Sequence, residues 1–259
     1  MVTRVGKIRN SMEQSLQGRV ALVTGAARRV GAAIARRLHD AGMQVVLHYR
    51  ESERDARALE RELNAARAGS AACVRAELLD ADAPRVLIEA ALERFARLDL
   101  LVNNASTFYA TRFGEIETRH WDELMGSNLR GPLFLAQWAA PHLAKTQGAI
   151  VNITDIHADR PLKDYVVYTL AKAGLAALTK SLALELGPDV RVNAVAPGTI
   201  AWPEDDQFPT AERKRIVSTT PLGRIGTPAD IARVVEFLAS APFVTGQTVA
   251  VDGGRSVFL

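Results

Sequence analysis

Short apolar runs alternate with helical patterns along almost the whole chain, and this alternation restricts the fold more than any other feature. The runs lie at 19–24, 44–49, 70–76, 98–104, 148–154, 190–197 and 247–253. Helical patterns separate them, near 28–42, 52–67, 83–96, 118–144, 164–187 and 228–240. Strands that are apolar throughout indicate a parallel sheet with both faces covered. We therefore predict an α/β fold, a doubly wound parallel sheet of about seven strands flanked by helices on both faces.

The chain is expected to form one domain. Its 259 residues are enough for a sizeable core, and no Pro/Gly/Ser-rich linker or fixed-period repeat divides them. Residues 1–18 are basic and polar and lack the apolar core of a secretion signal, so we interpret them as a loose N-terminal extension. The predicted domain covers 19–259, with an insertion near 199–220.

Composition excludes several classes of partner. The 32 basic and 29 acidic residues are interspersed, which favours a mixed solvated surface over a nucleic-acid-binding stripe. The long apolar pattern near 164–187 contains Lys172, Lys180 and Glu185, so we expect a helix in the protein interior or a subunit interface, not a membrane span. A single cysteine, Cys73, excludes an internal disulfide and fits a reducing, cytoplasmic compartment. The five histidines show no metal-ligand spacing, so no metal site is expected.

A glycine-containing turn follows the first predicted strand. In "VTGAARRVGAA", Gly25 and Gly31 would let the backbone approach a pyrophosphate at the start of the next helix. Arg29 stands where a glycine is expected in this motif, and Arg28 precedes it. Two guanidinium groups there favour phosphate contacts, although solvated side chains at a helix start would also explain them.

The end of the second strand indicates which dinucleotide would bind. NAD-preferring sites usually place an acidic residue there to bond the ribose 2′-hydroxyl. The strand ends instead in "LHYRES", where His48 and Tyr49 are followed by Arg50, and Ser52 supplies a hydroxyl. We therefore predict NADP, with a 2′-phosphate at Arg50. Glu77, at the end of the third strand, is either an adenine contact or a surface acid.

Tyr168 and Lys172 form the sharpest chemical constellation. They lie one helical turn apart at the start of the helix after the fifth strand, beside the predicted cofactor crevice. A phenol is a poor proton shuttle at neutral pH, and a nearby ammonium would favour its phenolate. Asn128, in a predicted helix, either bonds backbone or holds a water.

Several motifs together carry a family resemblance. The arrangement of "TGAARRVG", "NNAS", Asn128, "YTLAK" and "APG" resembles the short-chain dehydrogenase/reductase superfamily over residues 19–259. Within it, the chain is similar to the pteridine reductases of bacterial type. The similarity rests on Arg29 in place of glycine, Ser106 after "NNA", Phe108 just beyond, and Asp155 where serine is usual. The segments "WPEDD" and "FVTGQTVAVDGGRS" are also similar to that group.

The resemblance implies a Rossmann-like fold, NADPH as hydride donor, a homotetramer, and reduction of a dihydropterin or dihydrofolate. It implies a catalytic group of Asp155, Tyr168 and Lys172 with Asn128. It places the pterin between Phe108 and the nicotinamide, with the substrate contacted by Arg29, Ser106, Phe108, Asp155, Tyr168 and Trp202. The cofactor residues would be Gly25, Arg28, Arg29, Val30, Gly31, His48, Tyr49, Arg50, Ser52, Glu77, Leu78, Asn104, Ala105, Ser106, Tyr168, Lys172, Pro197, Gly198 and Ile200. Arg255 would contribute to a neighbouring subunit's site.

Asp155 separates two reactions. Carbonyl reduction develops an alkoxide, which a hydroxyl donor stabilises and a carboxylate would repel. Reduction of C=N requires a proton at nitrogen, which an acid group near Tyr168 would assist. The sequence leaves open whether Asp155 or Tyr168 carries that proton. Two alternatives also stay open: a 3-oxoacyl or sugar-alcohol carbonyl reductase, and a catalytically silent cofactor-binding sensor.

Overall fold

The structure is a computed structural model, and it describes residues 14–202 and 209–258. Most of the predicted extension and most of the "WPEDD" segment lie outside these residues. The described end of the extension is not loose. The Gln14 N–H donates to the Ser240 carbonyl at 3.0 Å, and the Leu16 side chain is buried in the core. The domain therefore begins a few residues before the predicted boundary at residue 19.

Seven parallel strands form one sheet in the order β3-β2-β1-β4-β5-β6-β7. The prediction of a doubly wound parallel sheet of about seven strands is confirmed. The strands are β1 (Val20–Val23), β2 (Gln44–Tyr49), β3 (Ala71–Arg75), β4 (Leu100–Asn103), β5 (Ala149–Ile153), β6 (Arg191–Pro197) and β7 (Thr248–Val251).

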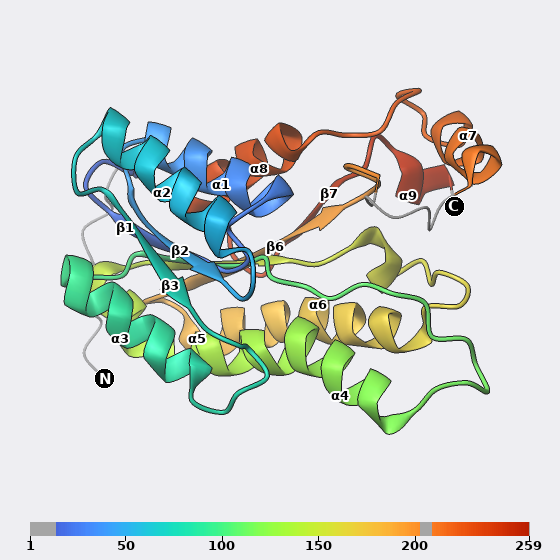
Figure 1. Ribbon diagram of the computed structural model, residues 1–259, viewed down its shortest axis with the longest axis horizontal. Coiled ribbons are helices and arrows are strands. Elements are labelled where there is room, and N and C mark those ends of the chain that lie inside the picture. Colours follow the sequence, from blue (N-terminus) through green and yellow to red (C-terminus); the bar gives the residue numbers. More distant parts are fainter. Residues whose placement is uncertain (1–13, 203–208, 259) are drawn as a thin grey trace, which may run out of the picture.

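Helices cover both faces of the sheet, which gives three layers (Figure 1). One face carries α1 (Arg29–Asp40), α2 (Glu53–Ala66) and α8 (Pro228–Ser240). The other carries α3 (Ala83–Phe95), α4 (Thr118–Met125), α5 (Gly131–Thr146) and α6 (Val166–Leu186). The short helices α7 (Thr210–Ser218) and α9 (Arg255–Phe258) lie beyond the end of β7 (Figure 1). Among the described helices, none combines the length and apolarity needed to cross a membrane.

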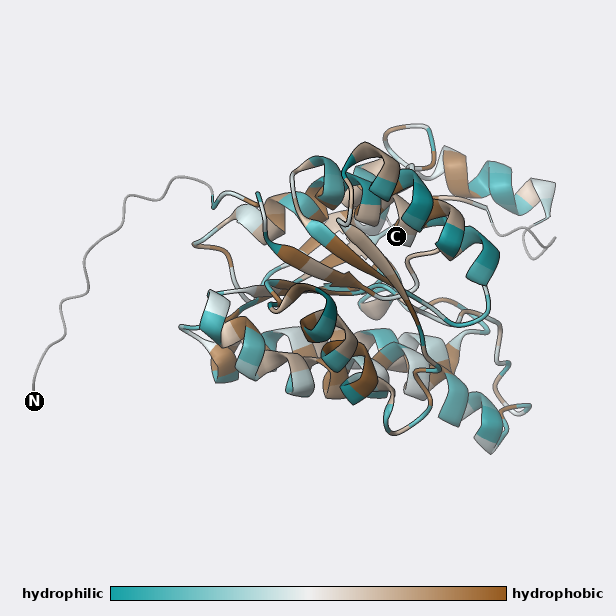
Figure 2. Cartoon of the chain, turned by 60° about the vertical axis from the view of Figure 1, so that its left-hand side comes forward, coloured by the Kyte–Doolittle hydropathy of each residue, from teal (hydrophilic) through white to brown (hydrophobic). Residues whose placement is uncertain are grey.

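The central strands bury both of their faces, as their sequences require, whereas the edge strand β7 is partly exposed. In β1, Ala21 and Val23 belong to the core beneath α1 and α8, whereas Val20 and Leu22 belong to the core beneath α3 and α5. All four side chains are fully buried. Figure 2 shows the same arrangement, with brown hydrophobic strands between helices whose outer sides carry much of the hydrophilic teal. Continuous apolar runs are therefore the expected signature of these strands.

The predicted helix over 118–144 is interrupted. A π-helical turn, Gly126–Arg130, separates α4 from α5 and contains Asn128. A Cβ at Gly126 would lie 2.4 Å from a terminal methyl of Leu79, so a larger residue here would require the Leu79 side chain to move. A π-turn of this kind often marks a functional position.

The sheet order creates the crevice where ligands bind in such folds. From β1 the chain proceeds outward through β2 and β3, then returns to the other side of β1 as β4. The loops after β1 and β4 consequently leave in opposite directions. Ligands of open α/β sheets bind outside the carboxyl ends of the strands at this switch point.

Candidate active site

A cavity of about 810 Å³ opens at the carboxyl edge of the sheet. Every residue predicted to bind cofactor or substrate lines it, and of the predicted site residues only Asn128 does not. The strands bring the glycine-containing loop after β1 and the Tyr168–Lys172 pair to the same cavity. The volume is suitable for part of a dinucleotide cofactor together with a small substrate.

The two glycines of the first loop are required by close backbone approach. A Cβ on Gly31 would lie 2.1 Å from the Gly25 carbonyl oxygen and 2.7 Å from the amide nitrogen of Asn104. Gly25 has φ +61°, and a Cβ there would lie 3.0 Å from the backbone of Ala105. The loop thus exposes backbone at the N-terminus of α1, a helix of 12 residues, where an anionic pyrophosphate is favoured. The residues present fit the implied cofactor.

Asn104 fastens the loops after β1 and β4 to each other. Its amide donates to the carbonyls of Thr24 at 2.8 Å and Gly25 at 3.2 Å. In return, the Thr24 hydroxyl accepts hydrogen bonds from the N–H groups of Asn104 and Ala105. Asn104, which was predicted to bind the cofactor, therefore fixes the position of the loop after β1, whose backbone would bind the pyrophosphate.

Two arginines lie in the cavity wall beside acidic side chains. Arg28 lies 3.6 Å from Asp55, and Arg50 lies 3.4 Å from Glu51 and 3.7 Å from Glu77. All these side chains are partly exposed, so each ion pair contributes roughly 0–1 kcal/mol. A bound phosphate could therefore replace these carboxylates as the partner of Arg28 or Arg50. Glu77 also accepts a hydrogen bond from the Leu79 N–H, which fixes it at the cavity wall.

Arg29 adopts a left-handed backbone conformation, with φ +52° at the start of α1. This conformation is the one that the expected glycine would take without strain. The Arg29 guanidinium donates to the carbonyls of Ala201 at 3.0 Å and Trp202 at 3.4 Å. Arg29 therefore ties the loop after β1 to the segment that closes the cavity beyond β6.

Tyr168 and Asp155 are in direct contact. The Tyr168 phenol donates to Oδ2 of Asp155 at 2.8 Å, and Oδ1 accepts from the His157 N–H at 2.8 Å. Burial raises the pKa of Tyr168 well above its usual 10.0, and the Asp155 charge and hydrogen bond raise it further. Lys172 was expected to favour the phenolate of Tyr168, but burial and the Asp155 carboxylate at the hydroxyl both favour the protonated phenol in the free protein.

Lys172 is buried beneath the same site. Its ammonium donates to the Ile153 carbonyl at 2.9 Å and lies 5.7 Å from the centre of the Tyr168 ring. Burial lowers the pKa of Lys172 to about 8, although the charge of Asp155 opposes this shift. Lys172 therefore loses its proton more readily than an ordinary lysine, and it lines the cavity.

Asn128 is completely buried in the π-turn. Its amide nitrogen donates to the carbonyls of Thr107 and Leu124, both at 3.0 Å. Its Oδ1 is buried and has no hydrogen-bond partner among the described residues. Of the two roles left open by the sequence, the structure shows the backbone one, and it holds Thr107 at the cavity wall.

Phe108 is held by two tyrosines. Its ring is stacked on Tyr165 at 4.6 Å between centroids and 14° between planes, and it meets Tyr168 edge-on at 4.8 Å. Phe108 lines the cavity, whereas Tyr165 does not. One face of Phe108 is therefore backed by an aromatic ring, and its position relative to the phenol of Tyr168 is set.

Sequence reasoning missed part of the cavity wall. Thr154, His157 and Leu162 come from the loop after β5, and Glu212, Arg215 and Ile216 come from α7. The remaining unpredicted lining residues are Ala27, Glu51, Thr107, Ser127, Ile153, Thr199 and Ala201, and Arg255, expected at a neighbouring subunit's site, lines the cavity of its own chain. A position after a strand end was the available signal for the first group. The second group lies in an insertion without a motif.

The resemblance assigns Arg255 to a neighbouring subunit's site, and within its own chain Arg255 contacts α7. Arg255 is buried, and its guanidinium donates to the Ile216 carbonyl at 2.9 Å and the Thr219 hydroxyl at 2.7 Å. These groups belong to the end of α7 and its C-cap, so the side chain anchors that helix beside its own cavity. Helix C-termini favour such cations.

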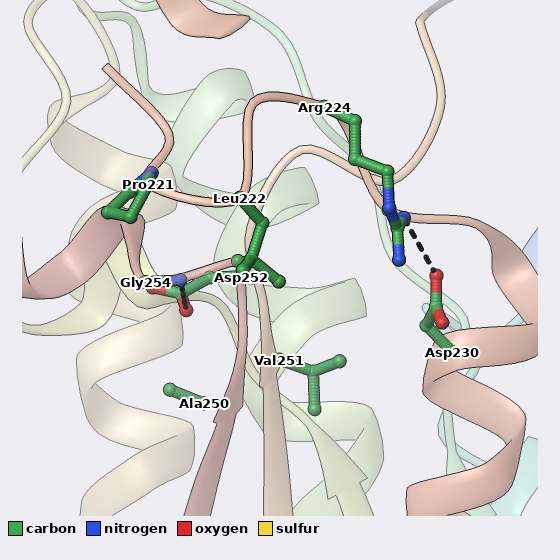
Figure 3. A pocket seen from close by; sticks show the side chains of 10 residues that line it. Pro221, Leu222, Arg224, Asp230, Ala250, Val251, Asp252 and Gly254 are labelled. Atoms are coloured by element: carbon green, nitrogen blue, oxygen red, sulfur yellow. Dashed lines mark hydrogen bonds and ion pairs between the residues drawn. The ribbon is translucent and has the colours of Figure 1, made fainter. Parts of the chain in front are cut away.

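A second hollow, of about 420 Å³, lies between the loop after α7 and the end of β7 (Figure 3). Its polar groups are paired with one another. Arg224 lies 3.4 Å from Asp230, and Asp252 accepts hydrogen bonds from the N–H groups of Gly254 and Ser256. Across residues 14–202 and 209–258, no cluster of histidine, cysteine or acidic side chains could hold a metal ion.

The sheet order, the glycine loop and the buried tyrosine–lysine pair in one cavity define a dinucleotide-dependent oxidoreductase. Comparison with known families agrees. A family model described as enoyl-(acyl carrier protein) reductase matches residues 25–256. The chain belongs to this family, and thereby to the short-chain dehydrogenase/reductase superfamily.

Several curated relatives are similar over almost their whole length. An uncharacterized oxidoreductase of Methylorubrum extorquens is 39% identical over 245 residues, which is 92% of this chain and 98% of the relative. A 3-oxoacyl-[acyl-carrier-protein] reductase of Synechocystis is 38% identical, covering 94% of this chain and 99% of the relative. A 3beta-hydroxysteroid dehydrogenase of Eggerthella lenta is 35% identical, covering 95% and 97%.

Proposed function

We propose that this protein is an NADPH-dependent pteridine reductase that converts a dihydropterin to a tetrahydropterin and also accepts dihydrofolate. The observation that carries the proposal is the contact of 2.8 Å between the Tyr168 phenol and the Asp155 carboxylate. Phe108 and Arg29, both in the cavity wall, support it.

The contact suits a substrate nitrogen better than a carbonyl oxygen. Reduction of C=N adds a hydride, which NADPH supplies when bound, to a ring carbon and a proton to the adjacent nitrogen. The Tyr168 phenol holds a proton in the cavity, and Asp155 lies within hydrogen-bond reach to exchange it. A developing alkoxide at the same place would be repelled by the carboxylate charge. Proton delivery by a positioned group contributes typically about 10²- to 10⁴-fold.

The cavity wall suits a flat bicyclic substrate. Because Tyr165 backs Phe108, the Phe108 ring is a rigid platform on which a pterin would stack at little entropic cost. Ser106 and Trp202 also line this part of the cavity. A small aliphatic ketone would gain little from such a platform.

Arg28, Arg50 and Ser52 support a preference for NADPH over NADH. All three line the cavity, and the two guanidinium groups would favour the 2′-phosphate of a bound NADPH. The family is one of NAD(P)H-dependent reductases, so the choice between the two cofactors is the part that we propose.

We also propose a homotetramer that acts in the cytoplasm. Six large apolar side chains on α4, α5 and α6 are exposed in the single chain: Trp121, Leu133, Phe134, Trp138, Leu170 and Leu184. Further copies of this chain would cover such a surface.

A carbonyl reductase of the same superfamily is the second candidate, and a specific observation favours it. Two of the three relatives reported above are named for carbonyl or hydroxyl substrates, namely 3-oxoacyl groups and 3β-hydroxysteroids; the third name specifies no substrate, and none names a pterin. On sequence similarity alone, this candidate has the stronger support. The Asp155 carboxylate at the phenol is the reason that we place it second.

One absorbance assay separates the two candidates. Oxidation of NADPH or NADH at 340 nm is followed with dihydrobiopterin, dihydrofolate or an acetoacetyl thioester as substrate. We expect turnover with dihydrobiopterin and NADPH, loss of that turnover in Tyr168→Phe, and little reduction of the thioester. Turnover of the thioester with no pterin reduction would overturn the proposal in favour of the second candidate.

A further inference from the structure

His48 lies at the end of β2 and has both ring nitrogens engaged by backbone. Its side chain is only 2% exposed. The Gly25 N–H lies 3.1 Å from Nδ1, and the Ala76 carbonyl oxygen lies 3.1 Å from Nε2. The imidazole therefore spans from the loop after β1 to the segment after β3.

The two backbone partners determine the protonation of the ring. A backbone N–H only donates and a carbonyl only accepts, so Nδ1 carries no hydrogen and Nε2 carries one. Burial lowers the pKa of His48 to about 4, which keeps the ring neutral at physiological pH. Both hydrogen bonds therefore persist there in one tautomer.

The ring connects two walls of the cofactor cavity. Gly25 begins the loop that approaches the pyrophosphate, and Ala76 directly precedes Glu77 and Leu78, which also line the cavity. Because β2 lies between β1 and β3, a side chain at its end can reach both neighbours. Backbone bonds from Ala26 to the His48 carbonyl and from Ala76 to the Tyr49 carbonyl reinforce the same register.

We propose that His48 is a positioning residue that sets the spacing between the pyrophosphate loop and the adenosine wall of the cofactor site. It acts through Gly25 and Ala76, not by touching the cofactor with its ring nitrogens, since both are already engaged. The Gly25 N–H is engaged as well, so anionic phosphate oxygens must be bound by the later N–H groups at the start of α1.

Three substitutions at His48 separate the two contacts. In His48→Asn the side-chain oxygen lies near the position of Nδ1 and can keep the Gly25 bond. In His48→Gln the amide lies near Nε2 and can keep the Ala76 bond. His48→Phe keeps the ring shape and removes both. The matched control is His39→Phe, because His39 is also a buried histidine with a hydrogen bond, to Ser70 Oγ at 2.7 Å, but it does not line the cavity.

Binding of 2′,5′-ADP and of NADPH to each folded variant is measured by calorimetry. We expect the dissociation constants to rise about fivefold in His48→Asn and His48→Gln, the effect of one neutral hydrogen bond, and more in His48→Phe. In the His48 variants the KM for NADPH should rise by a larger factor than kcat falls, because the substitutions act on the cofactor site. His39→Phe should lower the thermal midpoint without changing either dissociation constant.

Two results would overturn the proposal. One is a dissociation constant within twofold of the wild-type value in both His48→Asn and His48→Gln. The other is a ¹⁵N NMR spectrum of the free protein in which Nδ1 of His48, and not Nε2, carries the hydrogen. If His48→Phe does not fold, the two polar variants and the NMR spectrum still decide. None of these measurements depends on whether the substrate is a pterin or a ketone.

Discussion

The phenol of Tyr168 and the carboxylate of Asp155 lie 2.8 Å apart, although 13 residues separate them in the chain. Asp155 follows β5, and Tyr168 is in the first turn of α6. The contact keeps Tyr168 protonated in the free protein, because a phenolate would face the Asp155 charge in a buried site. Tyr168 and Asp155 must therefore be considered together as the groups that hold and exchange the proton.

Replacement of Asp155 tests that unit. We expect Asp155→Ser to lower kcat for dihydrobiopterin by about 10²-fold, the usual contribution of positioned proton transfer. The same change removes the charge that raises the pKa of Tyr168, so that pKa should fall. The pH–rate profile and the absorbance of the phenolate measure the two effects. A variant that keeps pterin turnover and gains ketone reduction would contradict this role for Asp155.

Lys172 should impose a pH-dependent penalty on stability. The folded chain releases its proton near pH 8, whereas the ordinary value is 10.5. Between these two pKa values the unfolded chain binds more protons than the folded chain, so the free energy of unfolding increases as the pH rises. Below pH 8 the full penalty for the buried charge is present, on the order of 3 kcal/mol.

The Lys172→Met variant lacks this titration. Urea unfolding of both proteins at intervals from pH 7 to 10 measures the difference in their free energies of unfolding. We expect the free energy of unfolding of Lys172→Met, relative to that of wild type, to be highest at pH 7 and to decrease steadily above pH 8. A difference that stays constant across this range would show that the buried ammonium is not perturbed.

Arg29 should trade stability for function. Its φ of +52° is unfavourable for any residue with a Cβ, so Arg29→Gly should raise the free energy of unfolding by about 1 kcal/mol. The same variant loses the hydrogen bonds to Ala201 and Trp202 that hold the cavity wall, so the substrate KM should rise. Thermal unfolding and steady-state kinetics provide the two measurements. Arg29→Ala is the control, since it loses the same bonds but keeps the backbone strain.

Arg191 should be a major stabilising residue far from the chemistry. Its guanidinium donates to the carbonyls of Leu238 and Ala239, both at 2.7 Å, at the C-terminal end of α8. Arg191→Met leaves these partly buried carbonyls without a donor, so the free energy of unfolding should fall by about 2 kcal/mol. The control is Arg37→Met, which removes only a partly exposed ion pair of α1 with Glu236 on α8 and should cost at most about 1 kcal/mol. Equal losses in both variants would contradict this assignment.

Much of the architecture could be predicted because it follows from local pattern. The apolar runs match the seven strands closely, since a strand buried on both faces is composed mainly of apolar side chains. The order of motifs along the chain also placed the glycine loop, Asn104 and Tyr168 at one edge, because parallel strands all end there. The π-turn at Asn128 was missed, since a helical pattern does not show one extra residue in a turn.

The sequence by itself determined the fold class, the edge of the sheet that carries the site, and the residue types available there. The tertiary structure alone decided which of these groups touch. It placed Asp155, not Lys172, at the Tyr168 hydroxyl, turned Arg255 toward its own α7, and engaged both nitrogens of His48. Periodicity is a property of neighbours along the chain, whereas hydrogen bonds and pKa values depend on packing between residues far apart in it. That packing converts a tyrosine–lysine motif into a protonated phenol paired with a carboxylate.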